Sequence, residues 1–118
     1  MKSILIVEDN PLIVELIAQM LSDDYEVSSA PNGEAGVAAA RERRPDLILM
    51  DLMMPVMDGW EAIRALRSVW ATCRIPIIAV SATTDLKERR RADQAGADAH
   101  LGKPIDEDEL RATIARYL

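Results

Sequence analysis

Acidic, hydroxyl and basic side chains follow the short apolar runs of this 118-residue sequence. Each run has the length and aliphatic composition of a buried parallel β-strand. Because parallel strands point the same way, their carboxyl ends gather at one edge of the sheet. The residues that we expect to meet there are Glu8, Asp9, Asp51, Ser81 and Lys103. The sequence therefore predicts a site with three carboxylates, one hydroxyl and one ammonium.

Three carboxylates held close together repel one another, and each raises the pKa of the others unless a cation neutralises them. Ligation by oxygen alone suits a hard divalent ion, and Mg²⁺ typically binds a few carboxylates, waters and a phosphate. In such a setting a carboxylate oxygen can attack phosphorus and form an acyl phosphate. Positive groups would neutralise charge on the transferring phosphoryl group. These residue types thus favour Mg²⁺-dependent phosphoryl transfer.

Apolar runs alternate five times with helical patterns, which predicts a doubly wound α/β fold. We expect strands over 3–7, 25–30, 47–50, 77–80 and 98–101. We expect a first helix that starts at Pro11 after the N-cap Asn10, three helices over 33–43, 60–69 and 84–95, and a last helix after Asp106. The matching architecture is a flavodoxin-like (βα)5 three-layer sandwich with strand order 2-1-3-4-5. Its ligands bind where the order reverses, between strands 1 and 3. The three acids follow or end those two strands.

Two helices carry further expectations. The first helix has one apolar face, formed by Leu12, Ile13, Leu16, Ile17, Met20 and Leu21. The last helix opens with four acids in a capping-box pattern. We expect it to bury Leu110, Ile114, Tyr117 and Leu118.

Composition limits the class of protein. Apolar residues make up 49% of the chain, which argues against a disordered tail. The net charge of −6 argues against unassisted nucleic-acid binding. The single cysteine, Cys73, fits a reducing compartment. The apolar run near the N-terminus is too short for a signal peptide, and nothing approaches a membrane-spanning length. We expect one cytoplasmic domain over 1–118, with no output domain.

The motif at 51–59, Asp-Leu-Met-Met-Pro-Val-Met-Asp-Gly, together with Ser81 and Lys103-Pro104 at family spacing, resembles the receiver domain of response regulators. The resemblance covers essentially the whole chain. It implies a phosphoacceptor switch in two-component signalling that catalyses only its own phosphorylation and dephosphorylation. The implied partners are a histidine kinase or histidine phosphotransfer protein as donor, and a downstream protein as target. The chain would act as a monomer or as a phosphorylation-dependent homodimer.

The resemblance also assigns roles to residues. Asp51 would accept the phosphoryl group. Asp9, Asp51 and the backbone carbonyl of Met53 would bind Mg²⁺ directly, with Glu8 acting through water. Lys103 would neutralise phosphoryl charge, and its peptide bond to Pro104 would be cis. Ser81 would move to hydrogen-bond the phosphoryl group, changing the surface of the fourth helix, fifth strand and fifth helix.

One position departs from the usual family pattern, and two others bear on the lifetime of the phosphorylated form. His100 stands where the family has a Tyr or Phe that turns inward on phosphorylation. It is either a titratable switch or an ordinary surface residue. Met53 and Thr83 stand where side chains flank the path of attacking water, and neither is a base, so we expect slow hydrolysis of the aspartyl phosphate.

Other functions are possible on this fold. A haloacid-dehalogenase-type phosphatase wants an acid/base Asp two residues after the nucleophile, where this chain has Met53. A nucleotide or flavin binder wants a phosphate-cradling loop, and no Gly-x-x-x-x-Gly-Lys motif is present. A receiver that no longer accepts phosphate is disfavoured because all acceptor residues are present. A receiver excised from a larger response regulator or hybrid histidine kinase stays open as an alternative.

Overall fold

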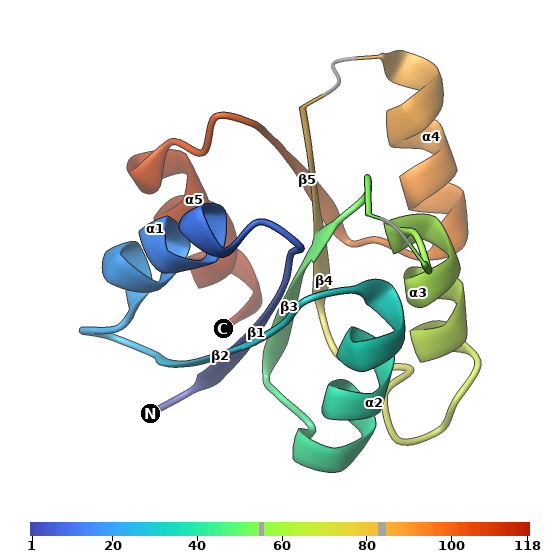
Figure 1. Cartoon of the computed structure of the whole chain (residues 1–118), viewed down its shortest axis with the longest axis horizontal. Helices are drawn as coiled ribbons and strands as arrows, with labels where there is room; N and C mark the ends of the chain where they lie inside the picture. The colour runs from blue at the N-terminus through green and yellow to red at the C-terminus, as the bar shows by residue number, and fades with distance from the viewer. Residues whose placement is uncertain (55, 83–84) are drawn as a thin grey trace.

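The computed structural model describes residues 1–54, 56–82 and 85–118. Five parallel strands form one sheet in the order β2-β1-β3-β4-β5, as the sequence predicts (Figure 1). The strands are β1 (Ser3–Val7), β2 (Glu26–Ala30), β3 (Leu47–Asp51), β4 (Ile77–Ser81) and β5 (Ala99–Gly102). The helices are α1 (Pro11–Leu21), α2 (Gly33–Arg43), α3 (Gly59–Arg67), α4 (Leu86–Ala95) and α5 (Glu107–Tyr117).

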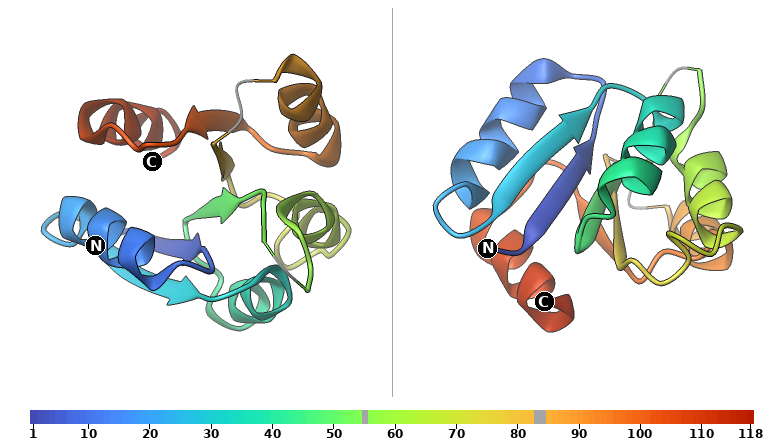
Figure 2. Two further views of the ribbon diagram at one scale, coloured as in Figure 1. Left: turned by 45° about the horizontal axis from the view of Figure 1, so that its top comes forward. Right: turned by 90° about the horizontal axis from the view of Figure 1, so that it is seen from below.

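The sheet separates two hydrophobic cores, which makes the molecule a three-layer sandwich (Figure 2). Successive residues of β1 show why its sequence is a continuous apolar run. Ile4 and Ile6 pack beneath α1 and α5, while Leu5 and Val7 pack beneath the layer of α2, α3 and α4. Side chains of a strand alternate between its two faces, so a strand covered on both faces is apolar throughout. The edge strands β2 and β5 are only partly buried.

Every helix begins at an Asn or Asp whose side chain accepts a hydrogen bond from the backbone of the first turn. Such caps satisfy N–H groups that have no partner inside the helix. The helix α4 begins at Leu86 after the cap Asp85, and the expected start at Thr84 lies outside the described residues. The helix is followed by the C-cap Gly96, whose φ of 119° other residues adopt only at a cost in conformational energy.

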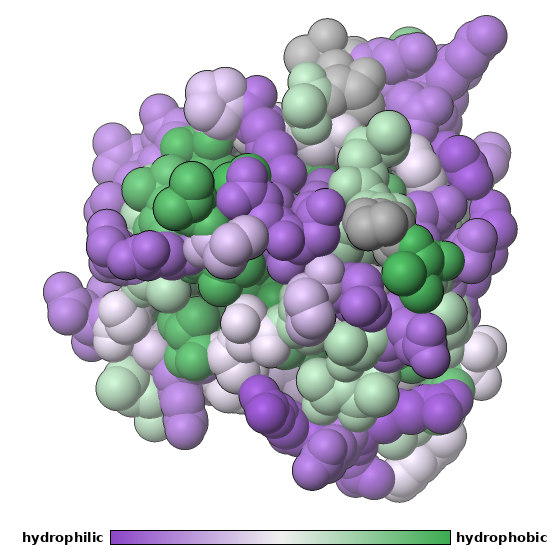
Figure 3. Space-filling view, viewed as in Figure 1, coloured by the Kyte–Doolittle hydropathy of each residue, from purple (hydrophilic) through white to green (hydrophobic). Residues whose placement is uncertain are grey.

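The predicted apolar face of α1 is only partly buried, which corrects the sequence interpretation. Ile17 and Leu21 are buried, but Leu12 is 73% exposed and Leu16 is 47% exposed. A single helix can turn only one stripe toward a sheet, and these two leucines lie beyond that stripe. Figure 3 shows strongly hydrophobic side chains gathered over α1. Similarly, Tyr117 and Leu118 are half-buried rather than buried.

The guanidinium of Arg67 holds the loop between α3 and β4 in place. It donates to the carbonyl oxygens of Cys73 at 3.0 Å, Ile75 at 2.6 Å and Gly96 at 2.9 Å, and to Asp98 Oδ2 at 2.7 Å. Thr72 Oγ1 adds a buried hydrogen bond to the carbonyl of Leu66 at 2.7 Å. These bonds anchor the loop at both of its ends.

No helix in the described part of the chain has the length and apolar character needed to cross a membrane.

Candidate functional site

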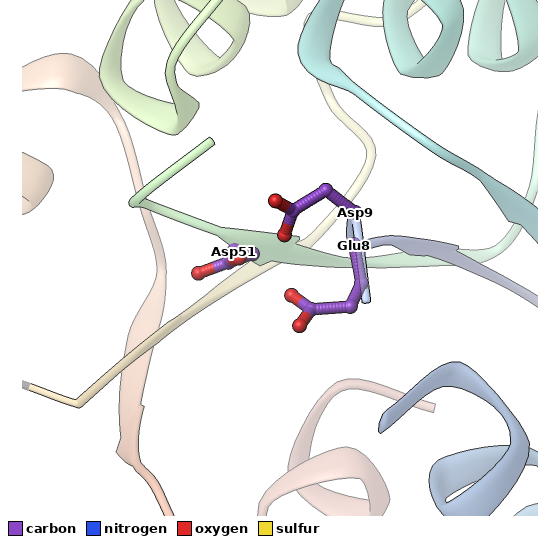
Figure 4. Close-up of side chains that lie close together, drawn as sticks. All are labelled: Glu8, Asp9 and Asp51. Carbon is purple, nitrogen blue, oxygen red and sulfur yellow. The ribbon is translucent and has the colours of Figure 1, made fainter. Parts of the chain in front are cut away.

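Three carboxylates converge at the carboxyl edge of the sheet (Figure 4). Glu8 and Asp9 directly follow β1, and Asp51 is the last residue of β3. One carboxylate oxygen from each residue lies within 4.8 Å of the others. Glu8 and Asp51 are buried, whereas Asp9 is exposed. The sequence prediction brought together the same three acids.

Strand register and one close backbone contact position these acids. In the parallel pairing of β1 with β3, Val7 stands beside Met50, so the residues that follow leave the sheet together. The first residue of α3, Gly59, lies directly against the end of β3. A Cβ at this position would overlap the carbonyl oxygen of Asp51 and lie 2.6 Å from Leu52 Cα. Glycine therefore permits α3 to start beside Asp51.

Lys103 supplies the positive charge of the cluster. Its Nζ lies 3.1 Å from Glu8 Oε1 and 3.5 Å from Asp51 Oδ1. The backbone of Lys103 is fixed by a hydrogen bond from its N–H to the carbonyl of Ser81 at 2.9 Å, which also places the buried Ser81 at this edge. The peptide bond between Lys103 and Pro104 is cis. Sequence reasoning placed Lys103 here but missed its ion pair with Glu8.

Burial and like charge raise the pKa of one of the acids, Glu8. The pKa of Glu8 is raised from 4.5 to about 7, first by burial and then by its hydrogen bond and charge interaction with Asp51. The ammonium of Lys103 acts in the opposite direction. Asp51 Oδ1 also accepts a hydrogen bond from the Met53 N–H at 3.2 Å. The site thus holds more negative charge than its single lysine balances.

The donor set fits a hard divalent cation. All side-chain donors are carboxylate oxygens, which are ligands that Mg²⁺ prefers. When all three carboxylates are ionised, one ammonium leaves two negative charges unbalanced, the charge of one divalent ion. The exposed side of Asp9 leaves the cluster open to solvent, as an ion that keeps several waters requires.

Comparison with known proteins identifies the family. The sequence model of the response regulator receiver domain matches residues 4–115. The chain belongs to the response regulator receiver domain family. It is 38% identical to the protein PilH of Pseudomonas aeruginosa, over 100% of this chain and 98% of PilH.

Solved receiver structures have the same fold. The chemotaxis protein CheY4 of Vibrio cholerae aligns with a TM-score of 0.94 at 32% identity, covering 100% of this chain and 99% of CheY4. The receiver domain of the sensor histidine kinase PA1611 from P. aeruginosa PAO1 aligns with a TM-score of 0.91 at 38% identity, covering 98% and 96%. Its structure was solved with a magnesium ion coordinated in the active site cleft. Receiver domains are signalling switches.

A hollow of about 620 Å³ lies beside the three acids. Its lining includes Ser81, Met53 and Trp60. Trp60 is 4% exposed, and Arg91 Cζ of α4 lies 4.0 Å from the centre of its ring. The Met53 side chain is 63% exposed. Thr83, expected to flank the path of water, lies outside the described residues. The packing of Trp60 therefore connects the carboxyl edge of the sheet to α4.

His100 lies on β5 in a hollow of about 420 Å³ between α4 and α5. Its ring is half-buried, and the buried Nε2 has no hydrogen-bond partner in the described part of the chain. Burial lowers the pKa of His100, the charge of Arg89 lowers it further, and the charge of Asp93 raises it. The ring is therefore less readily protonated than an exposed histidine. Its role as a switch stays a prediction.

Proposed function

We propose that this receiver domain is a phosphoacceptor switch of a two-component or phosphorelay system, acting in the cytoplasm. Asp51 receives a phosphoryl group from a histidine kinase or histidine phosphotransfer protein. The observation that carries this proposal is the cluster of Glu8, Asp9 and Asp51, with oxygens within 4.8 Å and the Lys103 ammonium beside them. No other group of three or more His, Cys, Asp or Glu side chains in the described part of the chain is placed to hold a metal ion.

Asp51 acts as the nucleophile in this proposal. One of its carboxylate oxygens forms a bond to phosphorus while the bond from phosphorus to the histidine nitrogen of the donor breaks, and the electron pair leaves with that nitrogen. The hydrogen bond from the Met53 N–H orients the carboxylate by binding Oδ1. Lys103, already 3.5 Å from Oδ1, neutralises charge on the phosphoryl oxygens.

Four residues would hold Mg²⁺: Asp9 and Asp51 through their carboxylates, Met53 through its backbone carbonyl, and Glu8 through water. Bound there, the ion supplies further positive charge to the phosphoryl oxygens. Ser81 is buried at the end of β4 beside the backbone of Lys103. We assign its hydroxyl the role of a ligand for the phosphoryl group once it is on Asp51.

We expect a protein donor that reaches Asp51 to contact α1, because α1 begins two residues after Asp9. The exposed Leu12 and Leu16 offer it an apolar surface at this place. We expect Leu12→Ser to slow phosphoryl transfer from a purified phosphotransfer protein that labels the wild type. Labelling by acetyl phosphate should be unchanged, because that small donor needs no docking surface.

On phosphorylation we expect the surface of α4, β5 and α5 to change and to regulate a downstream protein. We call the carboxyl edge of the sheet, with Glu8, Asp9, Asp51, Ser81 and Lys103, the acceptor edge. The packing of Arg91 on Trp60 gives α4 a direct contact with this edge, which supports the expectation. Phosphorylation shifts a pre-existing equilibrium when the two states bind the phosphoryl group unequally. Beryllofluoride activation should then move backbone resonances on α4, including those around Arg91. The shifted state would act as a monomer or as a homodimer.

The deciding experiment is labelling with acetyl phosphate and Mg²⁺. We expect one phosphoryl group per chain, labile to hydroxylamine, and lost in Asp51→Asn. Asp58→Asn is the matched control, because Asp58 lies on the same loop and asparagine can also cap α3. Stoichiometric labelling of Asp51→Asn, or full labelling in excess chelator, would refute the assignment.

A further inference from the structure

A solvent-exposed tryptophan stands at the edge of the sheet opposite the acceptor site. Trp70 lies on the loop between α3 and β4 and is 84% exposed. This loop and the C-terminal end of α2 lie together at the lower end of the molecule in Figure 1. Large exposed aromatic side chains are enriched where proteins bind partners.

The exposure of Trp70 does not come from a loose loop. Arg67 holds the carbonyl groups of Cys73 and Ile75, and Thr72 holds that of Leu66. Backbone hydrogen bonds from Thr72 and Cys73 to the carbonyl of Val69 close the turn around Trp70. An aromatic side chain presented on a fixed backbone loses little conformational freedom on binding. Trp70 is therefore preorganised as an anchor.

Two arginines lie near this anchor, and a third lines a neighbouring hollow. Arg44, at the C-cap of α2 with φ 47°, places its Cζ 5.7 Å from the centre of the Trp70 ring. Arg74 lines the same hollow of about 540 Å³ as Trp70, and Arg43 lines a second hollow. Both hollows share Pro45. None of these three arginines forms an ion pair with any residue that the structure describes.

We infer that this surface, here called the basal surface (Arg43, Arg44, Pro45, Trp70 and Arg74), binds an acidic segment of a partner protein. The unpaired guanidinium groups match carboxylates, which arginine binds through two parallel hydrogen bonds. Trp70 supplies apolar contact between them. Pro45 lines both hollows, so an extended segment that occupies both would pass over this residue.

A nucleic acid fits this surface less well. Phosphate backbones need a continuous basic track, but Asp46 lines the first hollow and Glu26 lines the second. The Asp46 carboxylate accepts from the N–H of Ser3 at 2.8 Å, so it is fixed in place. The overall charge of −6 also repels a long polyanion more strongly than a short acidic peptide.

The basal surface can be tested by NMR on the full chain. The probe is a short synthetic peptide of glutamate and leucine, and its counterpart with lysine in place of glutamate is the control. We expect the acidic peptide to shift the indole N–H resonance of Trp70, and the basic peptide to leave it unchanged. Followed through the backbone N–H resonances of Arg44 and Arg74, Trp70→Ala should weaken binding about tenfold, the range of a hot-spot aromatic. Because Trp70 is exposed, far-UV circular dichroism should show an unchanged fold.

A charge reversal separates specific binding from general attraction. Arg44→Glu should weaken binding at least tenfold, while Arg90→Glu on the exposed surface of α4 should change it less than twofold. Equal losses in the two variants, or no shift with the acidic peptide, would overturn the inference. So would tighter binding of oligothymidylate, or self-association of the wild type that Trp70→Ala abolishes. Asp51→Asn should bind normally, so this test is independent of the proposed phosphorylation.

Discussion

Two charged clusters differ in how their charge is balanced. One lies at the carboxyl ends of the strands, the acceptor edge, and the other lies at their amino ends. At the acceptor edge, Lys103 faces two buried carboxylates, and the pKa of Glu8 is raised to about 7. At the opposite edge, Arg67 faces one carboxylate and three carbonyl oxygens, and Asp98 Oδ2 also accepts from the Ile77 N–H at 2.8 Å. The first cluster holds excess charge that a ligand can neutralise, and the second is satisfied within the protein. The first cluster is therefore a candidate binding site, whereas the second stabilises the fold.

Removing the cation of the acceptor edge should have the largest effect. Lys103→Met should lower the rate of labelling by acetyl phosphate on the order of 100-fold, because it removes a preorganised charge from the transferring group. Lys87→Met, at an exposed position on α4, is the control and should label at the wild-type rate. Rates would be followed by hydroxylamine-sensitive radiolabel. A loss below about threefold would mean that Lys103 does not act on the phosphoryl group.

Removing the cation of the opposite edge should instead affect stability. Arg67→Ala leaves three carbonyl groups without their side-chain donor and removes one of the two donors of Asp98, so the free energy of unfolding should fall by about 2–4 kcal/mol. Urea denaturation measures this change.

Arg64→Ala, one turn earlier at an exposed position, should change stability by less than about 0.5 kcal/mol. At a temperature where Arg67→Ala is folded, its labelling at Asp51 should be near normal. A large loss of labelling in the folded variant would show that the two edges are not separate.

The raised pKa of Glu8, caused first by burial and then by Asp51, predicts a pH dependence of stability. Between pH 4.5 and about 7 the folded state holds a proton on Glu8 that the unfolded state has lost. Stability then falls as pH rises through this window, because the folded state binds more protons. Glu8→Gln should flatten that slope in metal-free urea denaturation, whereas Glu15→Gln, at an exposed position, should retain it. An identical slope in wild type and Glu8→Gln would contradict the raised pKa.

Backbone strain offers the smallest and most local test. Both edges carry a residue other than glycine in the left-handed region, Val56 (φ 71°) near the acceptor and Arg44 (φ 47°) at the end of α2. A β-branched residue is disfavoured there more than a linear one. Val56→Gly should therefore stabilise the protein by about 1 kcal/mol, and Arg44→Gly by less, because it also loses its contact with Trp70. Thermal denaturation measures both changes, and a loss of stability in Val56→Gly would show that strain at this position is not relieved.

The sequence predicted that the three acids converge, because strand topology brings them together. Once Val7 and Met50 are placed on neighbouring parallel strands, the acids that follow must converge. The order of the strands and the ends of most helices followed from apolar periodicity and from caps such as Asn10 and Gly96.

What escaped prediction depends on distances between side chains. Periodicity could not show that Leu12 and Leu16 lie outside the contact of α1 with the sheet. It also could not show that Lys103 pairs with Glu8, because many rotamers of a lysine reach the same edge. The network of Arg67 joins residues up to 29 positions apart through backbone carbonyls. Every residue has such a carbonyl, so no residue pattern indicates the network.

The fluorescence of the two tryptophans reports separately on the two edges. Trp60 is 4% exposed beside the acceptor site, and Trp70 is 84% exposed at the basal surface. The emission of an indole shifts to longer wavelength in water, and a dissolved quencher such as iodide reaches only an exposed ring. Iodide should therefore remove the red component, from Trp70, and leave the blue component, from Trp60. One cuvette of wild-type protein thus contains a separate optical reporter for each edge.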